Sequence, residues 1–253
     1  MRILCTNDDG LHSQGLEILM EVCASLGQVS CVAPDREQSA TSHSLTLHRP
    51  LRPIARGPDR WQVDGTPTDC VVLALGALLK PPPDFVVAGI NHGPNMGEDV
   101  LYSGTVAAAM EGLILGVPGV AVSFAGHDFG LIPGYRALLQ QLLGRILQAE
   151  RFPHDMLLNV NLPPVPAEAV KGVRVTTLGK RIYAESLSRM QDPWGREIFW
   201  IGGGRLDWTG GEEVDFKAVE DGCVSVTPLH VDLTNYRLLE AVRAWRRGEG
   251  GGR

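Results

Sequence analysis

The segment that decides the fold is Arg2-Ile3-Leu4-Cys5-Thr6-Asn7-Asp8-Asp9-Gly10. Its first five residues form a short apolar run typical of a buried strand, and its last four have the composition of a loop. Apolar residues then recur at helical spacing over residues 14–25, and residues 29–33 predict a second buried strand. Strand, loop, helix and strand in this order predict a βαβ unit and therefore a parallel sheet.

The alternation of strands and helices continues to about residue 161. Thr66-Pro67 predicts a helix start, because Thr is a good N-cap and Pro suits the first helical position. The pattern predicts an α/β fold, a mostly parallel sheet with helices on both faces. The expected strands are 44–54, 60–64, 84–89, 119–124 and 156–161, and the expected helices are 67–79, 103–115 and 135–150.

The pattern changes after about residue 180. Residues 197–207 and 213–227 suggest one or two β-hairpins, and residues 233–246 a final helix with Leu238, Leu239 and Val242 on one face. We expect a single domain over residues 1–253. The hairpin excursion at about 180–230 and the terminal helix at 231–247 are expected to serve oligomerisation, and the tail 248–253 is expected to be flexible.

Composition excludes several classes of protein. The chain has 253 residues with 44% hydrophobic and 21% charged, which is ordinary globular usage and long enough for a core without disulfides. The net charge is -6 and no basic run exceeds Arg246-Arg247, which argues against a nucleic-acid polymer as partner. No apolar stretch approaches the roughly 20 residues that span a bilayer, and no signal-peptide core is present, so we expect no membrane association. Five scattered cysteines without a C-x-x-C pair predict reduced thiols in a cytoplasmic protein.

Asp8 and Asp9 are the first candidate site residues. Two adjacent carboxylates at a strand end repel each other unless a proton or a cation neutralises them. Their hard oxygen atoms suit Mg²⁺, Mn²⁺ or Ca²⁺. The alternative from these residues alone is an ordinary Asp-Gly turn that needs no metal.

A second candidate loop covers residues 89–97 and leads into a predicted helix start at Ser103. Asn91 and Asn95 offer carbonyl oxygens and amide donors. A helix N-terminus presents free N–H groups and partial positive charge, which suit phosphate, and the Ser103 and Thr105 hydroxyls add donors. The alternative is that Ser103 only caps the helix.

The third loop, residues 36–43, is rich in donors, and the Ser39 hydroxyl is able to complete a sphere of oxygen ligands. Loops of this composition are more often simply solvated. The chain lacks the zinc, P-loop, dinucleotide-binding and nucleophile-elbow motifs H-E-x-x-H, G-x-x-x-x-G-K-[ST], G-x-G-x-x-G and G-x-S-x-G.

Together these segments resemble the SurE (survival protein) family of nucleotidases, which act on nucleoside 5'- and 3'-monophosphates. The resemblance covers four stretches of the first half in order, whereas the second half is similar only loosely. The matching stretches are residues 3–10, 32–39, 63–70 and 89–112.

The resemblance implies a Rossmann-like three-layer core with a swapped hairpin and C-terminal helix that build a homodimer or homotetramer. It implies a phosphoric monoester hydrolase, a 5'-nucleotidase with acid-phosphatase-like chemistry, that holds one divalent metal ion per subunit, Mg²⁺ or Mn²⁺. It assigns the metal ligands to Asp8, Asp9, Ser39 and Asn95, and the phosphate contacts to Asn91, Ser103, Gly104 and Thr105.

The expected reaction is attack of a water molecule on the phosphate, with Asp8 or Asp9 as base and catalytic residue. Direct attack by Asp8 to form an aspartyl-phosphate is the alternative. Two other functions stay open on the residues: a sensor that binds nucleotide without hydrolysing it, and a metal-dependent hydrolase of another bond.

Overall fold

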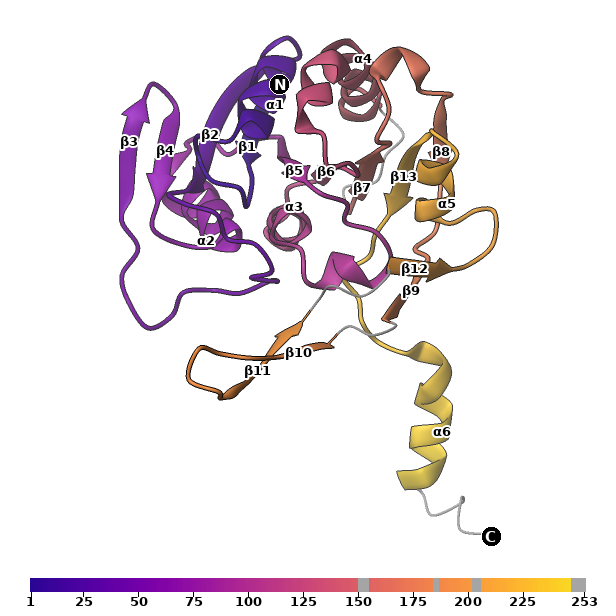
Figure 1. Cartoon of the computed structure of the whole chain (residues 1–253). Helices are drawn as coiled ribbons and strands as arrows, with labels where there is room; N and C mark the ends of the chain where they lie inside the picture. The colour runs from indigo at the N-terminus through magenta and orange to yellow at the C-terminus, as the bar shows by residue number, and fades with distance from the viewer. Residues whose placement is uncertain (150–154, 184–186, 202–205, 247–253) are drawn as a thin grey trace, which may run out of the picture.

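The fold is built on a nine-stranded sheet with strand order β3-β4-β2-β1-β5-β6-β7-β13-β8, shown in Figure 1. A computed structural model describes residues 1–149, 155–183, 187–201 and 206–246. The strands of this sheet are β1 (Arg2–Thr6), β2 (Gln28–Pro34), β3 (Pro53–Gly57), β4 (Arg60–Val63), β5 (Phe85–His92), β6 (Gly119–Phe124), β7 (Leu157–Leu162), β8 (Val173–Val175) and β13 (Val224–Pro228). The helices that flank it are α1 (Gln14–Ala24), α2 (Pro67–Leu73), α3 (Gly104–Ile114), α4 (Arg136–Leu147) and α5 (Asp215–Glu220).

The order of the strands creates a switch point between β1 and β5. From β1 the chain moves outward in one direction through β2 to β4, and then returns to place β5 on the other side of β1. Both neighbours pair with β1 in parallel, so the loops after β1 and β5 leave the same edge of the sheet in opposite directions. Ligands of open parallel sheets bind in the crevice at such a point.

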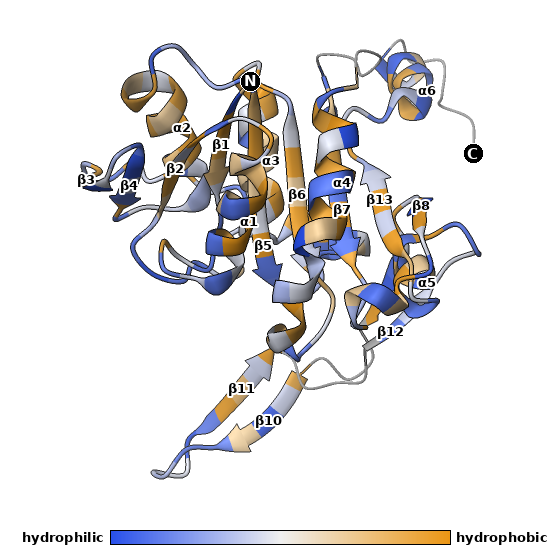
Figure 2. Cartoon of the chain, turned by 90° about the horizontal axis from the view of Figure 1, so that it is seen from above, coloured by the Kyte–Doolittle hydropathy of each residue, from blue (hydrophilic) through white to orange (hydrophobic). Residues whose placement is uncertain are grey.

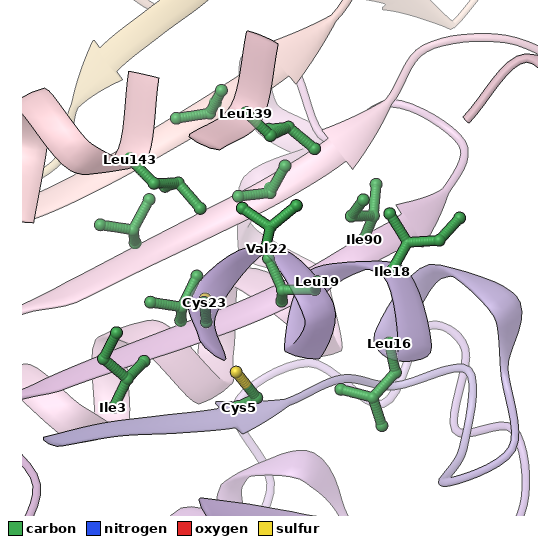
Figure 3. Close-up of a cluster of buried hydrophobic side chains, with 14 of the residues drawn as sticks. Ile3, Cys5, Leu16, Ile18, Leu19, Val22, Cys23, Ile90, Leu139 and Leu143 are labelled. Carbon is green, nitrogen blue, oxygen red and sulfur yellow. The ribbon is translucent and has the colours of Figure 1, made fainter. Parts of the chain in front are cut away.

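Two hydrophobic cores lie on the two faces of the sheet. Adjacent residues of β1 point to opposite faces, so Ile3 joins one core and Leu4 the other. The first core packs α1 and α4 against the sheet, as Figure 3 shows for Leu19, Leu139 and their neighbours. The second core packs α2 and α3 against the other face. The three-layer α/β arrangement predicted from the sequence is therefore confirmed.

Local sequence signals explain where the helices begin. The Ser13 hydroxyl accepts a hydrogen bond from the Leu16 N–H and caps α1. Thr66 and Asp69 form a capping box at the start of α2. The predicted start at Thr66-Pro67 is confirmed, although the end of this helix widens into a π-helical turn, Ala74–Leu78.

The predicted strand at 44–54 is wrong, because only its last two residues lie in a strand, β3. Residues 44–52 instead pack beside the start of α2. There the backbone N–H and the hydroxyl of Thr46 both donate to the buried carboxylate of Asp69, at 2.9 and 2.6 Å. The first of these bonds uses a backbone N–H that a strand would offer to a neighbouring strand.

The hairpin predicted at 213–227 is also wrong. This segment forms helix α5 and strand β13, and β13 returns to the main sheet, where it pairs antiparallel with β7 and parallel with β8. Its residues Val224, Ser225, Val226 and Thr227 are buried between these strands. The excursion expected at 180–230 is correspondingly shorter and ends before α5.

The shortened excursion consists of two small antiparallel pairs, β10 (Leu187–Gln191) with β11 (Glu197–Ile201) and β9 (Lys180–Tyr183) with β12 (Leu206–Thr209). Figure 2 shows the β10–β11 hairpin extending away from the body of the protein. The terminal helix α6 (Tyr236–Arg246) also projects from it (Figure 1) and has no buried residue. The predicted flexible tail, 248–253, lies outside the described residues.

Two further observations concern the chain as a whole. All five cysteines are buried free thiols. Within the described ranges, no helix has the length and apolar character needed to cross a membrane.

Candidate active site

The site lies above the switch point, where the loop after β1 carries Asp8 and Asp9. Asn7, fully buried at the end of β1, shapes this loop. Its side-chain amide donates to the Gly10 carbonyl at 3.0 Å and to the Ser13 hydroxyl at 2.7 Å. The turn is thereby tied to the start of α1, and the two carboxylates are held at the carboxyl edge of the sheet.

Asp8 is buried, with 5% of its surface exposed, against the first turn of α3. The hydroxyl of Thr105 donates to Asp8 Oδ1. Gly104 allows this close approach, because a Cβ there would lie 2.8 Å from Asp8 Cβ. Burial raises the pKa of Asp8 above its ordinary value, although the hydroxyl and the backbone N–H of Thr105 lower it in part.

Asp9 is half-buried, and its Oδ2 accepts a hydrogen bond from the His92 backbone N–H at 3.3 Å. Burial, with the neighbouring charge of Asp8 as second cause and that of Glu37 as a smaller one, raises the pKa of Asp9 to about 6. Carboxylates whose ionisation is disfavoured by burial and by one another gain strongly from a cation placed between them.

Asn95 is held by hydrogen bonds to both its backbone and its side chain. Its backbone N–H donates to Asn161 Oδ1 at 2.9 Å, and its carbonyl accepts from the side chains of Asn159 and Asn161 at 2.7 and 3.0 Å. Its own Nδ2 donates to the Ser123 hydroxyl at 2.8 Å. In the described part of the chain, Asn95 Oδ1 accepts no hydrogen bond, so this oxygen is open to a ligand.

The loop that carries Ser39 reaches the site through its backbone. The N–H of Gln38 donates to the Asp8 carbonyl at 2.7 Å. The Ser39 side chain is exposed, and its hydroxyl donates to Glu37 at 2.5 Å. The structure thus brings the loop against Asp8 but directs the Ser39 hydrogen to Glu37, which leaves the oxygen lone pairs for another partner.

The predicted phosphate residues gather around the start of α3 and the end of β5. Ser103 is the N-cap of α3, where its hydroxyl accepts from the Val106 N–H at 3.0 Å. The Gly104 N–H has no acceptor among the described residues. Asn91 follows an irregularity in the pairing of β5 with β6, and its Nδ2 donates to the Gly93 carbonyl at 2.8 Å.

The donor set fits a hard divalent cation. It offers two carboxylates, a free amide oxygen and a hydroxyl oxygen, which are the ligands that Mg²⁺ and Mn²⁺ prefer. Among the described residues, no group of three or more His, Cys, Asp or Glu side chains is arranged to hold a metal ion.

The sequence reasoning missed the residues that support the site. Glu37, Ser123, Asn159 and Asn161 were not singled out, although two asparagines in the buried strand segment Leu157–Leu162 are a readable signal for a polar role. Asp215 was missed as well, because nothing in its local sequence indicates where its carboxylate lies.

Comparison with known proteins gives one consistent result. Residues 3–185 match the family described as Survival protein SurE. The chain is 58% identical to the 5'-nucleotidase SurE of Gemmatimonas aurantiaca, over 97% of this chain and 98% of that protein. It is 48% identical to the 5'-nucleotidase SurE of Aeromonas hydrophila, again over 97% and 98% of the two chains. The crystal structure of the SurE protein from Aquifex aeolicus superposes with a TM-score of 0.88 at 43% identity, covering 97% of this chain and 100% of the other.

Proposed function

Because the chain belongs to the SurE survival-protein family, we propose that it is a 5'-nucleotidase. It hydrolyses nucleoside 5'-monophosphates to nucleoside and inorganic phosphate, and acts on 3'-monophosphates as well. The observation that carries the proposal is the Asp8–Asp9 pair at the switch point between β1 and β5, packed against the start of α3. This arrangement supports the proposal, because it would offer oxygen ligands to a cation beside the open Gly104 N–H, which suits a phosphate.

The proposed cofactor is one divalent ion per subunit, Mg²⁺ or Mn²⁺. Asp8, Asp9 and the free Oδ1 of Asn95 would hold it, with the Ser39 oxygen as a fourth ligand. When bound, such an ion supplies positive charge that offsets the charge of the phosphate group. The position of Asp8 and Asp9 supports this, because Asp8 is buried beside the neighbouring carboxyl of Asp9, and adjacent carboxylates gain from a cation placed between them.

Phosphate is proposed to bind at the start of α3. The open N–H of Gly104 and the partial charge of the helix N-terminus favour an anion there. Ser103, Thr105 and Asn91 line the approach. The hydroxyl of Thr105 is able to donate to a phosphate only when its hydrogen bond to Asp8 is broken. The first role of Thr105 is therefore to orient the Asp8 carboxylate.

The chemical step is attack of water on phosphorus. The water oxygen forms a bond to phosphorus, the ester P–O bond breaks, and the nucleoside leaves as its alcohol after taking up a proton. Asp9 is the better base for the water proton, because Asp8 is buried and engaged by Thr105, whereas Asp9 is partly exposed. Trapping of a phosphorylated Asp8 would instead support direct attack by the Asp8 carboxylate on phosphorus, which forms an aspartyl-phosphate.

The same chain is proposed to form a homodimer or homotetramer in the cytoplasm. Large apolar side chains are exposed on the β10–β11 hairpin and on α6, elements that bury little against their own chain, and exposed patches of this kind mark protein interfaces. They include Leu187, Met190, Phe199, Trp200 and Ile201 on the hairpin and Leu238, Val242 and Trp245 on α6. Five unpaired thiols agree with a reducing compartment. Light scattering of the protein and of a Trp200→Glu variant tests the assembly, and a monomer in both would reject it.

The decisive test of function is phosphate release from AMP and GMP by chelator-stripped protein, with Mg²⁺ or Mn²⁺ added back. We expect release to stop on chelation and to return with metal, and to be abolished in Asp8→Asn while its circular dichroism is unchanged. Nucleotide binding without phosphate release would instead support a sensor. Hydrolysis of substrates without a phosphate ester, and of no nucleotide, would support a metal-dependent hydrolase of another bond.

A further inference from the structure

The loop that carries Asn95 is held in place by side chains from the second half of the chain, where no site residue was expected. The segment involved is Asn95–Gly97, and two residues hold it from opposite ends. Asn161 on β7 holds Asn95, and Asp215 on α5 holds Gly97. Neither residue is exposed, and each is separated from the loop by 66 residues or more in the sequence.

Asn161 acts on Asn95 as a two-point clamp. Its Oδ1 accepts from the Asn95 N–H at 2.9 Å, and its Nδ2 donates to the Asn95 carbonyl at 3.0 Å. Because Ser123 accepts from Asn95 Nδ2, the plane of the side-chain amide is fixed too. The orientation of the remaining atom, Oδ1, is thereby restrained, as a metal ligand requires.

Asp215 fixes the other end of the segment. Its Oδ2 accepts from the Gly97 N–H at 2.8 Å, and its Oδ1 accepts from the N–H groups of Gly179 and Phe216, both at 2.9 Å. The carboxylate is fully buried, and the described part of the chain places no cation against it in an ion pair. Burial raises the pKa of Asp215, so keeping an ionisable group here costs stability that an apolar residue would not.

The contact between the loop and the segment before β9 is also tight. Gly97 has a positive φ of 56°, and a Cβ at this position would lie 2.9 Å from the Gly179 carbonyl oxygen. A side chain at residue 97 would push the two backbones apart and stretch the bonds to Asp215. The loop geometry beside Asn95 thus depends on a buried carboxylate 118 residues away.

We propose that Asn161 and Asp215 are positioning residues for the metal site, acting through Asn95. This inference rests on the proposed function, since it takes Asn95 Oδ1 as a metal ligand. Partners of this kind behind a ligand typically change metal affinity by about 10–100-fold when they are removed.

The test is calorimetric titration of Mn²⁺ into chelator-stripped protein. Asp215→Asn and Asn161→Leu are each expected to raise the dissociation constant for Mn²⁺ about 10–100-fold. Their kcat at saturating Mn²⁺ is expected to stay within a few-fold of wild type. Asp221→Asn is the matched control. It removes a carboxylate at the end of the same helix, α5, and this carboxylate accepts hydrogen bonds from Arg174 and Lys217 instead of from the loop of Asn95. We expect its Mn²⁺ affinity to be unchanged.

A double-mutant cycle distinguishes positioning from a general loss of structure. In an Asn95→Ala background, Asp215→Asn and Asn161→Leu should have no further effect on Mn²⁺ affinity, because the residue through which they act is absent. The proposal would be overturned if Asp215→Asn or Asn161→Leu lowered Mn²⁺ affinity in the Asn95→Ala background by the same factor as in the wild type. It would also be overturned if the single variants bound Mn²⁺ with wild-type affinity. If one single variant fails to unfold cooperatively, the cycle with the other decides. Absence of Mn²⁺ binding by the wild-type protein would instead reject the metal site itself.

Discussion

Thr105→Val is the substitution that separates the two possible roles of Thr105. Valine has the same β-branched shape as threonine, so the fully buried position keeps its packing. What is lost is the hydrogen bond from the hydroxyl to Asp8 Oδ1. In the structure this hydroxyl is bonded to the carboxylate of Asp8, a proposed metal ligand, whereas the resemblance to the nucleotidase family assigned it to phosphate.

The size of the effect follows from the kind of bond. A buried hydrogen bond to a charged group contributes about 1.5–3 kcal/mol, which corresponds to a change of roughly 10–150-fold in an equilibrium constant. Thr105 also lowers the pKa of Asp8, so its removal raises that pKa further and makes protons compete more strongly with metal. We therefore expect Mn²⁺ affinity to fall by roughly 10–150-fold at neutral pH, and by less at higher pH.

The assay measures two affinities separately. Mn²⁺ binding to stripped protein is followed by calorimetry, and inorganic phosphate binding is measured as inhibition of AMP hydrolysis at saturating Mn²⁺. Thr46→Val is the matched control, because the Thr46 hydroxyl donates to another buried carboxylate, that of Asp69, at 2.6 Å. It should lower stability by a similar amount and leave Mn²⁺ affinity unchanged.

Either of two results would refute the reasoning. If Thr105→Val weakened phosphate binding and left Mn²⁺ affinity as in wild type, Thr105 would be a phosphate contact and the bond to Asp8 would carry no function. Equal losses of Mn²⁺ affinity in Thr105→Val and Thr46→Val would show that any destabilisation of a buried carboxylate has this effect.

Three other substitutions probe the site. Gly104→Ala places a Cβ 2.8 Å from Asp8 Cβ and should reduce phosphate release at least tenfold (about 1.4 kcal/mol) at unchanged circular dichroism, whereas Gly76→Ala, where nothing lies within 4 Å, should retain full activity. Ser103→Ala removes the cap of α3 and should lower the free energy of unfolding by about 1 kcal/mol; it should also weaken phosphate binding by about 1.5–3 kcal/mol, and loss of stability alone would make Ser103 only a cap. For Asp9, the pKa rises from 3.8 to about 6 on folding, so the folded metal-free protein holds this proton more tightly than the unfolded chain. The free energy of unfolding of the metal-free protein should therefore fall as pH rises from about 4 to about 6. Urea titrations of Asp9→Asn at a series of pH values should lack this contribution to the pH dependence of the free energy of unfolding.

The elements that the sequence predicted well are those whose burial is uniform along the segment. Residues 119–124 are buried throughout as β6, and their apolar run alone identified them. The helix over 14–25 was recognised from one apolar face, with α1 observed at Gln14–Ala24. In both cases the core stabilises what the local pattern already favours.

The wrong elements are those in which a distant partner decided the backbone. Thr46 donates twice to Asp69, 23 residues away, and so residues 44–52 do not pair as a strand. Asp215 is buried and accepts the N–H groups of Gly97 and Gly179, and helix α5 begins at this residue where a hairpin was expected. Neither bond leaves a signal in the local composition.

By itself the sequence determined the α/β class, the helix starts, and the identity of the polar loops that follow the strands. It did so because periodicity, capping and strand-end chemistry act over a few residues. The tertiary structure decided what those loops do together. Strand order alone brings the loops of Asp8 and Asn95 to one edge, and burial alone gives Asp8 its partner in Thr105 and Asn95 its support in Asn161. These are contacts between residues 66 to 97 positions apart, and their energy comes from exclusion of water, which a linear pattern does not record.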